Sequence, residues 1–178
     1  LEHVDMLGLL TGAKISGEIA RSRPHLVRRL VLVQSLVMPE TDRLALKEEL
    51  QSGVRESWKR EGSKYYVTRL KDALASRDAG LPVDQAVSDF SDSLVAGKDY
   101  LKGGMTALSY PAEEKYKEIT QSTLVVTLGD ERAATAGAAD IINGARLLRL
   151  PEYSRNTFRS NPGSIAAHMR AFLDTPER

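Results

Sequence analysis

The chain has 178 residues, which is long enough for one domain with a substantial buried core. Its 25 basic and 24 acidic residues leave a formal net charge of +1, so charge gives no reason to expect a nucleic acid or an acidic partner. The absence of cysteine excludes a disulfide framework, a thiolate nucleophile and cysteine metal ligands, and it fits a reducing compartment.

The first segment reads as a strand, a tight turn and a helix. Residues 3–7 form a short apolar stretch, glycines follow at positions 8 and 12, and a helical pattern covers residues 13–22. Polar side chains recur at helical spacing and predict a solvated stripe on this helix. These residues are Lys14, Glu18 and Arg21.

A second strand is predicted over residues 28–34, which are rich in branched residues and follow Pro24. Basic residues gather just before and at the start of this strand, and we interpret them as a solvated rim and not as a nucleic-acid site. They are Arg21, Arg23, Arg28 and Arg29.

The middle of the chain, residues 39–110, is predicted to be helical without strands. Thr41 is a candidate helix cap, and apolar residues recur along three helical faces. These residues are Leu46, Leu50, Val54 and Trp58, then Tyr66, Leu70 and Leu74, then Val83, Val87, Phe90 and Leu94. A helical segment between two strands predicts either a cap over the sheet or a helical extension packed on itself, and we favour the cap.

Strand and helix alternate again toward the end of the chain. We expect strands over residues 123–128 and 146–150, with a helix over residues 133–142 between them. Asn161 and Pro162 have the residue types of a helix cap and a first-turn proline, so a last helix is predicted to begin there.

The spacing Gly8-x-Leu10-x-Gly12 resembles the nucleophile elbow of the α/β-hydrolase family. The stretches ARSRPHLVRRLVLV, ITQSTLVVTLGD and PGSIAAHMRAFLD are similar to later segments of the same family. The resemblance implies an α/β fold with a parallel sheet of the α/β-hydrolase type, comprising the C-terminal half of that fold, with a helical cap insertion. Residues 1–38 and 111–178 would form the core, and residues 39–110 the cap.

The resemblance also indicates where a catalytic triad belongs, in the order nucleophile, acid and histidine. The apex of the elbow is Leu10, the usual acid position is Arg132, and the usual histidine position is Arg155. Asp130 or Glu131 becomes an alternative acid after a small change of register. With all three positions substituted, we expect no serine-nucleophile esterase, and whether the chain is an enzyme at all stays open.

No other residue is a strong candidate to replace the missing catalytic triad. His3, His25 and His168 are predicted to be structural or solvated, and their spacing does not suit a metal site, so no metal and no cofactor is expected. Thr11 is a weaker nucleophile candidate, because making it the apex puts Leu9 where a small residue is needed. Ser154 is near the lost histidine position but has no visible base.

The expected ligand-binding residues are Leu9, Leu10, Thr11, Arg132 and Arg155. The N–H of Thr11 would point into the pocket from a helix start, and the two guanidiniums either hold an anionic group or pair with acids at the rim. We expect a small hydrophobic carbonyl-type ligand and a non-hydrolytic reaction of the lyase or cyclase type. A catalytically silent binding or regulatory protein is the alternative, and a hydrolase with an atypical site ranks below both.

Hydrolases of this family carry further strands before the elbow. The predicted first strand would be an exposed apolar edge without them. We therefore expect the N-terminal half of the fold to come from missing residues or another chain, with a homo-oligomer as one possibility. No apolar run approaches the roughly 20 residues that span a bilayer, and no signal peptide is visible. A cytoplasmic protein with a small-molecule ligand and no membrane or nucleic-acid partner is the expectation.

Overall fold

The computed structural model describes residues 3–61, 64–75, 82–96, 101–129 and 133–176, with only the backbone for residues 53–61 and 133–134. The chain divides into two compact units. Residues 1–40 and 110–178 form the first unit, and residues 41–109 form the second.

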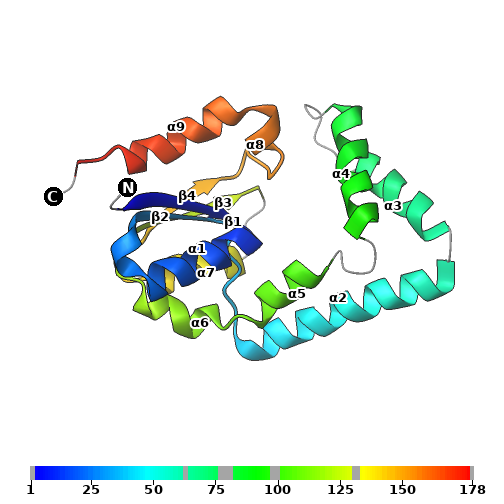
Figure 1. Cartoon of the computed structure of the whole chain (residues 1–178), viewed down its shortest axis with the longest axis horizontal. Helices are drawn as coiled ribbons and strands as arrows, with labels where there is room; N and C mark the ends of the chain where they lie inside the picture. The colour runs from blue at the N-terminus through cyan, green and yellow to red at the C-terminus, as the bar shows by residue number, and fades with distance from the viewer. Residues whose placement is uncertain (1–2, 62–63, 76–81, 97–100, 130–132, 177–178) are drawn as a thin grey trace. The chain divides into compact units, whose positions relative to one another are not determined.

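A four-stranded parallel sheet forms the centre of the first unit, in the order β1-β2-β3-β4. Its strands are β1 (Val4–Leu9), β2 (Val27–Val33), β3 (Ser122–Leu128) and β4 (Arg146–Leu150). Every connection between them contains helix, as parallel neighbours require. The parallel sheet that the sequence predicted is therefore confirmed (Figure 1).

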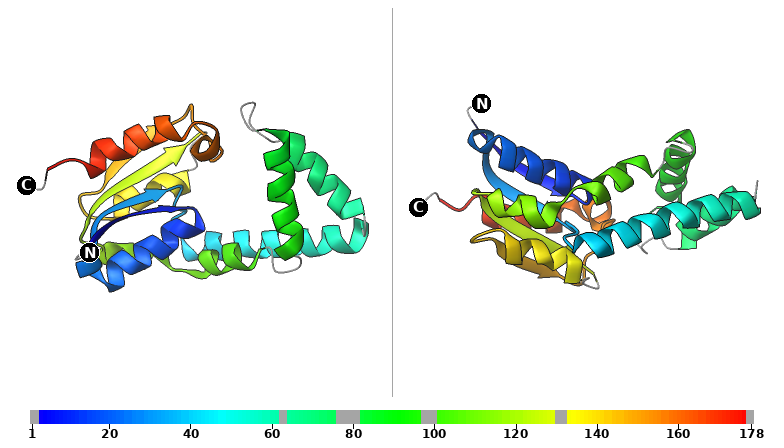
Figure 2. Two further views of the ribbon diagram at one scale, coloured as in Figure 1. Left: turned by 45° about the horizontal axis from the view of Figure 1, so that its top comes forward. Right: turned by 90° about the horizontal axis from the view of Figure 1, so that it is seen from below.

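Helices cover both faces of this sheet. Helices α1 (Thr11–Ser22) and α7 (Ala133–Ile141) pack on one face, and α9 (Pro162–Leu173) packs on the other (Figure 2). The shorter elements of this unit are η1 (Pro24–Leu26), α6 (Ala112–Lys115), η3 (Tyr116–Glu118) and α8 (Thr157–Ser160).

The apolar run of β2 is explained by burial on both faces. Leu30 and Leu32 belong to the core under α1 and α7, and Val31 and Val33 belong to the core under α9. All four side chains are fully buried. A strand covered on both faces reads as a continuous hydrophobic run and does not alternate with polar residues.

Helix α9 begins as its sequence predicts. Pro162 is its first residue, and the side chain of Asn161 accepts a hydrogen bond from the N–H of Ser164 at 3.4 Å. The cap therefore satisfies one of the free N–H groups of the first turn.

Strand β1 pairs with β2 alone among the described residues. Its Val4 and Leu7 are 37% and 43% exposed. The expectation that further residues or another chain pair with this edge stays a prediction.

The second unit is helical throughout the part that the structure describes. Its elements are α2 (Glu40–Glu61), which begins at the boundary of the two units, α3 (Lys64–Ala75), α4 (Val83–Ala96) and α5 (Lys102–Ser109). The Thr41 cap was wrong, because α2 already begins at Glu40. Val83, Val87 and Leu94 are 41–51% exposed, so the predicted apolar face of α4 is only half covered. The side chains of Val54 and Trp58 lie outside the described residues.

Two cations that were predicted to be solvated are buried. Lys14 is 8% exposed, and its Nζ contacts the carbonyl oxygen of Leu36 and lies 5.4 Å from the ring centre of Tyr116. Arg29 is 6% exposed and donates to the carbonyl oxygens of Leu173 and Thr175. The stripe and rim interpretations were wrong at these positions, because acceptors from distant segments replace water.

Among the described residues, no helix is both long enough and apolar enough to cross a membrane.

Candidate functional site

The turn between β1 and α1 has the geometry of a strained elbow. Leu10 lies there with φ 54° and ψ −113°. Its N–H donates to the carbonyl oxygen of Val33 at 3.0 Å, and its own carbonyl accepts from the N–H of Ala13 at 3.0 Å. Positive φ at a non-glycine residue typically costs 1–3 kcal/mol and persists only where surrounding contacts hold it. These two hydrogen bonds hold the Leu10 backbone at the end of β1.

Of the two glycines that flank this turn, only Gly8 is required by the space around it. A Cβ on Gly8 would lie 2.3 Å from the carbonyl oxygen of Gly12 and 2.6 Å from the Oγ of Ser16. A Cβ on Gly12 would meet nothing within 4 Å. The close passage of strand and helix therefore depends on Gly8, and space does not require a glycine at position 12.

A second strained residue, Gln34, follows β2 directly, with φ 52°. Its backbone N–H donates to Val126 at 2.9 Å, and its Nε2 donates to the carbonyl oxygen of Leu128 at 3.0 Å. Its Oε1 is buried and has no hydrogen-bond partner among the described residues. Sequence reasoning missed Gln34, although a polar residue right after a fully apolar strand was a visible signal.

Register brings Gln34 and the elbow together. Leu9 and Val33 are paired across β1 and β2, so Leu10 and Gln34 follow paired residues on strands about 4.8 Å apart. Thr11 is the first residue of α1, and its N–H has no acceptor within the helix. The start of a helix favours a carbonyl oxygen or an anion at this point. Leu9, Leu10 and Thr11 are all half-buried, so this end of the sheet combines apolar surface with donor and acceptor groups.

The described part of the structure does not place the two expected arginines, Arg132 and Arg155, in contact with the other predicted site residues. Arg132 lies outside the described residues, together with Asp130 and Glu131. Arg155 is exposed in the turn between β4 and α8, and its side chain forms no hydrogen bond or ion pair within the described ranges.

The three histidines and Ser154 are exposed or make structural contacts, and their described surroundings do not form a catalytic site. His3 and His25 are exposed, and the ring of His168 lies edge-on to Tyr153 at 5.6 Å. The Oγ of Ser154 accepts from the N–H of Asn156 at 3.0 Å, which orders the turn before α8. Across the parts of the chain that the structure describes, no group of three or more His, Asp or Glu side chains is placed to hold a metal ion.

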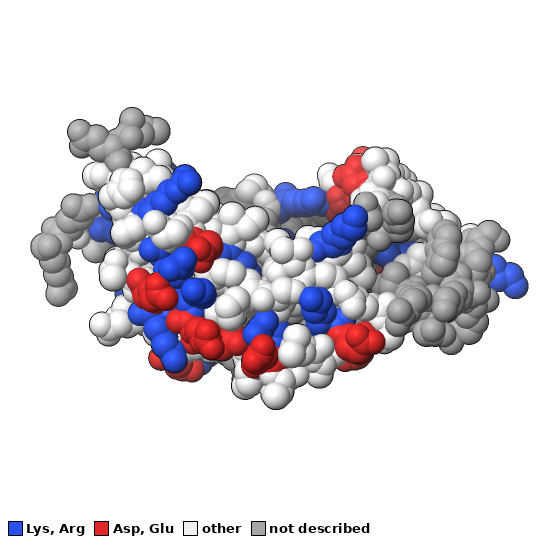
Figure 3. Space-filling model, turned by 60° about the horizontal axis from the view of Figure 1, so that its bottom comes forward, with Lys and Arg blue, Asp and Glu red and all other residues white. Residues whose placement is uncertain are grey.

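An ion-pair network covers the outer side of α1. Arg21 bonds to Glu18 at 2.7 Å and to Glu118 at 2.8 Å, and the hydroxyl of Tyr110 donates to Glu18 at 2.6 Å. The hydrogen bond from Arg21 lowers the pKa of Glu18 to about 2, whereas burial raises the pKa of Tyr110. On the face shown in Figure 3, basic and acidic side chains are interspersed.

A buried tyrosine links α1 to the chain after β2. Tyr116 is completely buried, its hydroxyl donates to the carbonyl of Ala13 at 3.2 Å, and it lies 3.0 Å from the Oγ of Ser35. Burial raises the pKa of Tyr116 to about 12. This phenol therefore stays neutral and acts as a structural hydrogen-bonding group close to the elbow helix.

No family model and no curated protein sequence matches the chain. Solved structures do match it. A hydrolase from Pseudomonas aeruginosa PA01 is 23% identical with a TM-score of 0.64, over 98% of this chain and 66% of that one. Est816, described as an N-acyl homoserine lactone degrading enzyme, is 15% identical with a TM-score of 0.71, over 96% and 68%. The enol-lactonase from Burkholderia xenovorans LB400 is 13% identical with a TM-score of 0.62, over 98% and 66%.

These similarities identify the class of protein by its fold. The chain has the α/β-hydrolase fold, and it spans 66 to 68% of the length of these three proteins. At such low identities the likeness concerns the fold alone.

Proposed function

We propose that the chain binds a small carbonyl-bearing ligand at the carboxyl end of its sheet and acts on it without covalent attack. The observation that carries this proposal is Leu10 at the apex of the strained turn. Hydrolases of this fold place their nucleophile on such a turn, and the carbon side chain of leucine cannot attack a carbonyl.

The groups around Leu10 suit binding and polarisation. The N–H of Thr11 at the start of α1 is placed to donate a hydrogen bond to a ligand oxygen. Gln34 lies beside it at the end of β2, but its Oε1 is buried and is not exposed to a ligand. Donors placed where charge develops on an oxygen stabilise an enolate or a related transition state. A lyase or cyclase type of reaction is therefore our first candidate, and two of the similar structures are described as acting on lactones.

The second candidate is a catalytically silent binding protein on the same fold. In the first candidate, Arg132 and Arg155 hold an anionic group of the ligand. The exposure of Arg155 equally fits a residue with no role in the site, as a silent protein would have. A silent protein would bind the carbonyl compound and leave it chemically unchanged.

Two assays test the proposal. The first treats the purified chain and Leu10→Ser with p-nitrophenyl acetate and a fluorophosphonate label. We expect no stoichiometric labelling of the wild type and no burst in Leu10→Ser, because a serine without a neighbouring base stays protonated. Labelling of the wild type would show that the nucleophile lies elsewhere.

The second assay follows deuterium exchange into γ-butyrolactone in D₂O by NMR, and a separate titration in H₂O uses the Thr11 amide signal as the binding readout. Faster exchange of the protons next to the carbonyl favours the enzyme, because polarisation by the Thr11 N–H acidifies them. A shift of the Thr11 signal without exchange favours the silent protein, and the absence of any shift contradicts binding at this site.

A further inference from the structure

A cavity of about 610 Å³ lies at the opposite, amino end of the strands. It is lined by the first residues of three neighbouring strands and by the end of α9, and these include Arg28, Arg29, Ser122, Arg146, Phe172 and Thr175. Its volume is in the range of small-molecule sites. Parallel strands of five to seven residues separate it from Leu10 by roughly 20 Å, so it is distinct from the candidate site above.

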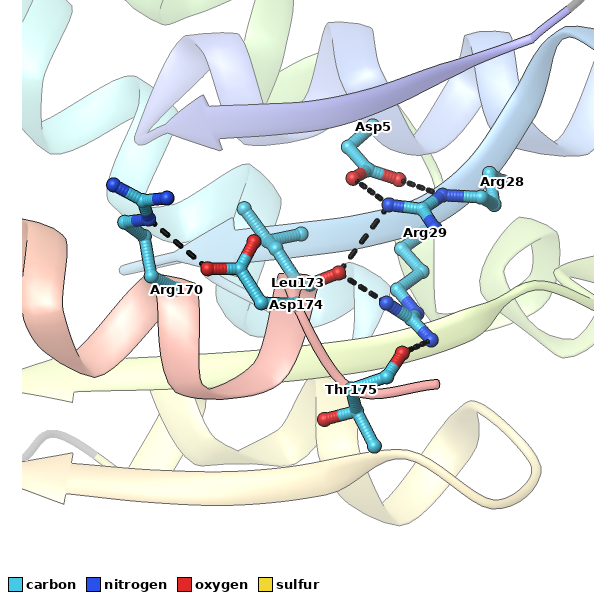
Figure 4. Close-up of polar contacts among 7 residues, drawn as sticks. All are labelled: Asp5, Arg28, Arg29, Arg170, Leu173, Asp174 and Thr175. Carbon is cyan, nitrogen blue, oxygen red and sulfur yellow. Dashed lines mark hydrogen bonds and ion pairs between the residues drawn. The ribbon is translucent and has the colours of Figure 1, made fainter. Parts of the chain in front are cut away.

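Arg29 places a buried positive charge at the wall of this cavity. The side chain is 6% exposed, and its Nη1 and Nη2 donate to the carbonyl oxygens of Leu173 and Thr175 (Figure 4). These two hydrogen bonds use two of the five donors of a guanidinium. Carbonyl dipoles at the end of α9 compensate part of the charge, but no described carboxylate pairs with Arg29.

Arg146 adds a second guanidinium on the same aromatic ring. The Cζ atoms of Arg29 and Arg146 each lie 5.9 Å from the ring centre of Phe172. Arg146 is exposed at the start of β4 and has no ion pair within the described ranges. Two like charges that line one cavity repel each other, and a bound anion would offset that repulsion.

The other groups at the wall leave the charge of the cavity positive. Arg28 forms an ion pair with Asp5, which lowers the pKa of the Asp5 carboxyl, so this pair is neutral overall (Figure 4). Ser122 is paired in register with Arg29 across β2 and β3, and its hydroxyl has no hydrogen-bond partner among the described residues. The Ser122 hydroxyl therefore lines the same cavity as two guanidiniums that form no ion pair with a described carboxylate.

We propose that this cavity is a binding site for a small organic anion carrying a phosphate or carboxylate group. The planar donor fork of arginine matches both groups in a bidentate manner. Arg146 supplies the accessible fork, Arg29 supplies a fixed buried charge, and Ser122 supplies a neutral donor.

The test measures binding to the full chain by calorimetry at low ionic strength. Phenyl phosphate and benzoate serve as the anionic probes, and methyl benzoate serves as the uncharged probe. Both anions are expected to bind more tightly than methyl benzoate, and the tighter of the two identifies the preferred anionic group. Added salt weakens this binding, because Arg146 is exposed and its charge is screened.

Substitutions locate the site. Arg146→Gln is expected to weaken anion binding about tenfold, which corresponds to the loss of one charge-assisted hydrogen bond. The matched control is Arg170→Gln, because Arg170 is 75% exposed, pairs with Asp174 and does not line the cavity (Figure 4). We expect the control to change affinity less than about twofold. Circular dichroism of each variant checks that the fold is kept.

The proposal is overturned if methyl benzoate binds as tightly as benzoate, if neither anion binds, or if Arg146→Gln and Arg170→Gln have equal effects. Leu10→Ser should leave anion binding unchanged. The experiments therefore distinguish failure of the proposed function at the carboxyl end of the sheet from failure of the proposed anion site in this cavity.

Discussion

Leu10 donates its backbone N–H to the carbonyl oxygen of Val33 at 3.0 Å, and this bond ties the strained apex of the first turn to the last residue of β2. The apex is therefore supported by the neighbouring strand as well as by its own helix. A residue held in this way retains an unfavourable φ of 54° that an isolated turn would relax.

At Leu10, glycine should give a more stable protein than alanine, which is the reverse of their usual order within a helix. Glycine adopts positive φ without a steric penalty, whereas alanine keeps the strain. We expect Leu10→Gly to be more stable than Leu10→Ala by ~1 kcal/mol. Urea unfolding of both variants measures the difference. The same pair at Leu44, an exposed position within α2, is the control and should show alanine as the more stable variant.

The two glycines of the elbow should differ sharply when each is changed to alanine. Gly8→Ala places a Cβ 2.3 Å from a backbone carbonyl that cannot move without distorting α1, so we expect a loss of ~2–3 kcal/mol or more. Gly12→Ala meets open space and is expected to be neutral or to gain up to about 1 kcal/mol from helix propensity. Equal losses in thermal unfolding of the two variants would contradict the assigned geometry.

The Glu18 ion pair should contribute a stability that acid removes. The pKa of Glu18 is lowered from 4.5 to about 2 in the folded state, so its contribution is complete above pH 4.5 and is lost as the pH falls toward 2. The carboxylate is 38% exposed, which limits the effect to ~0.5 kcal/mol. Glu18→Gln should flatten the stability curve between these pH values, whereas Glu114→Gln, at an exposed position of α6, should not.

Removing the hydroxyl of Tyr116 should destabilise the first unit. Tyr116→Phe leaves the carbonyl of Ala13 and the hydroxyl of Ser35 without their buried partner, at a cost of ~1–3 kcal/mol. A double-mutant cycle with Ser35→Ala isolates the bond between the two side chains. A coupling energy near zero would show that these two hydroxyls do not interact.

Much of the fold was readable from local pattern. The strand over residues 146–150 was predicted at its observed bounds, and the other strands differ by one or two residues at their ends. Runs of branched apolar residues and the pair Asn161-Pro162 carry this information, because strand burial and helix capping depend on a few adjacent residues.

The site was readable only in part. The elbow spacing placed Leu10 correctly at the turn, but Gln34 was missed, because its buried oxygen and positive φ arise where β2 meets the turn region of the sheet. Arg132 lies outside the described residues, so its place in the pocket stays a prediction.

By itself, the sequence determined the order of strands and helices along this chain, since that order follows from short-range hydrophobic and capping patterns. The parallel sheet was expected from the resemblance of the elbow and the later segments to the α/β-hydrolase family. Tertiary structure alone decided which polar side chains are buried. Lys14 contacts a carbonyl 22 positions away, and Arg29 contacts carbonyls 144 and 146 positions away. Helical or strand periodicity compares only neighbouring residues, so it cannot show that a distant carbonyl will replace water around a charge.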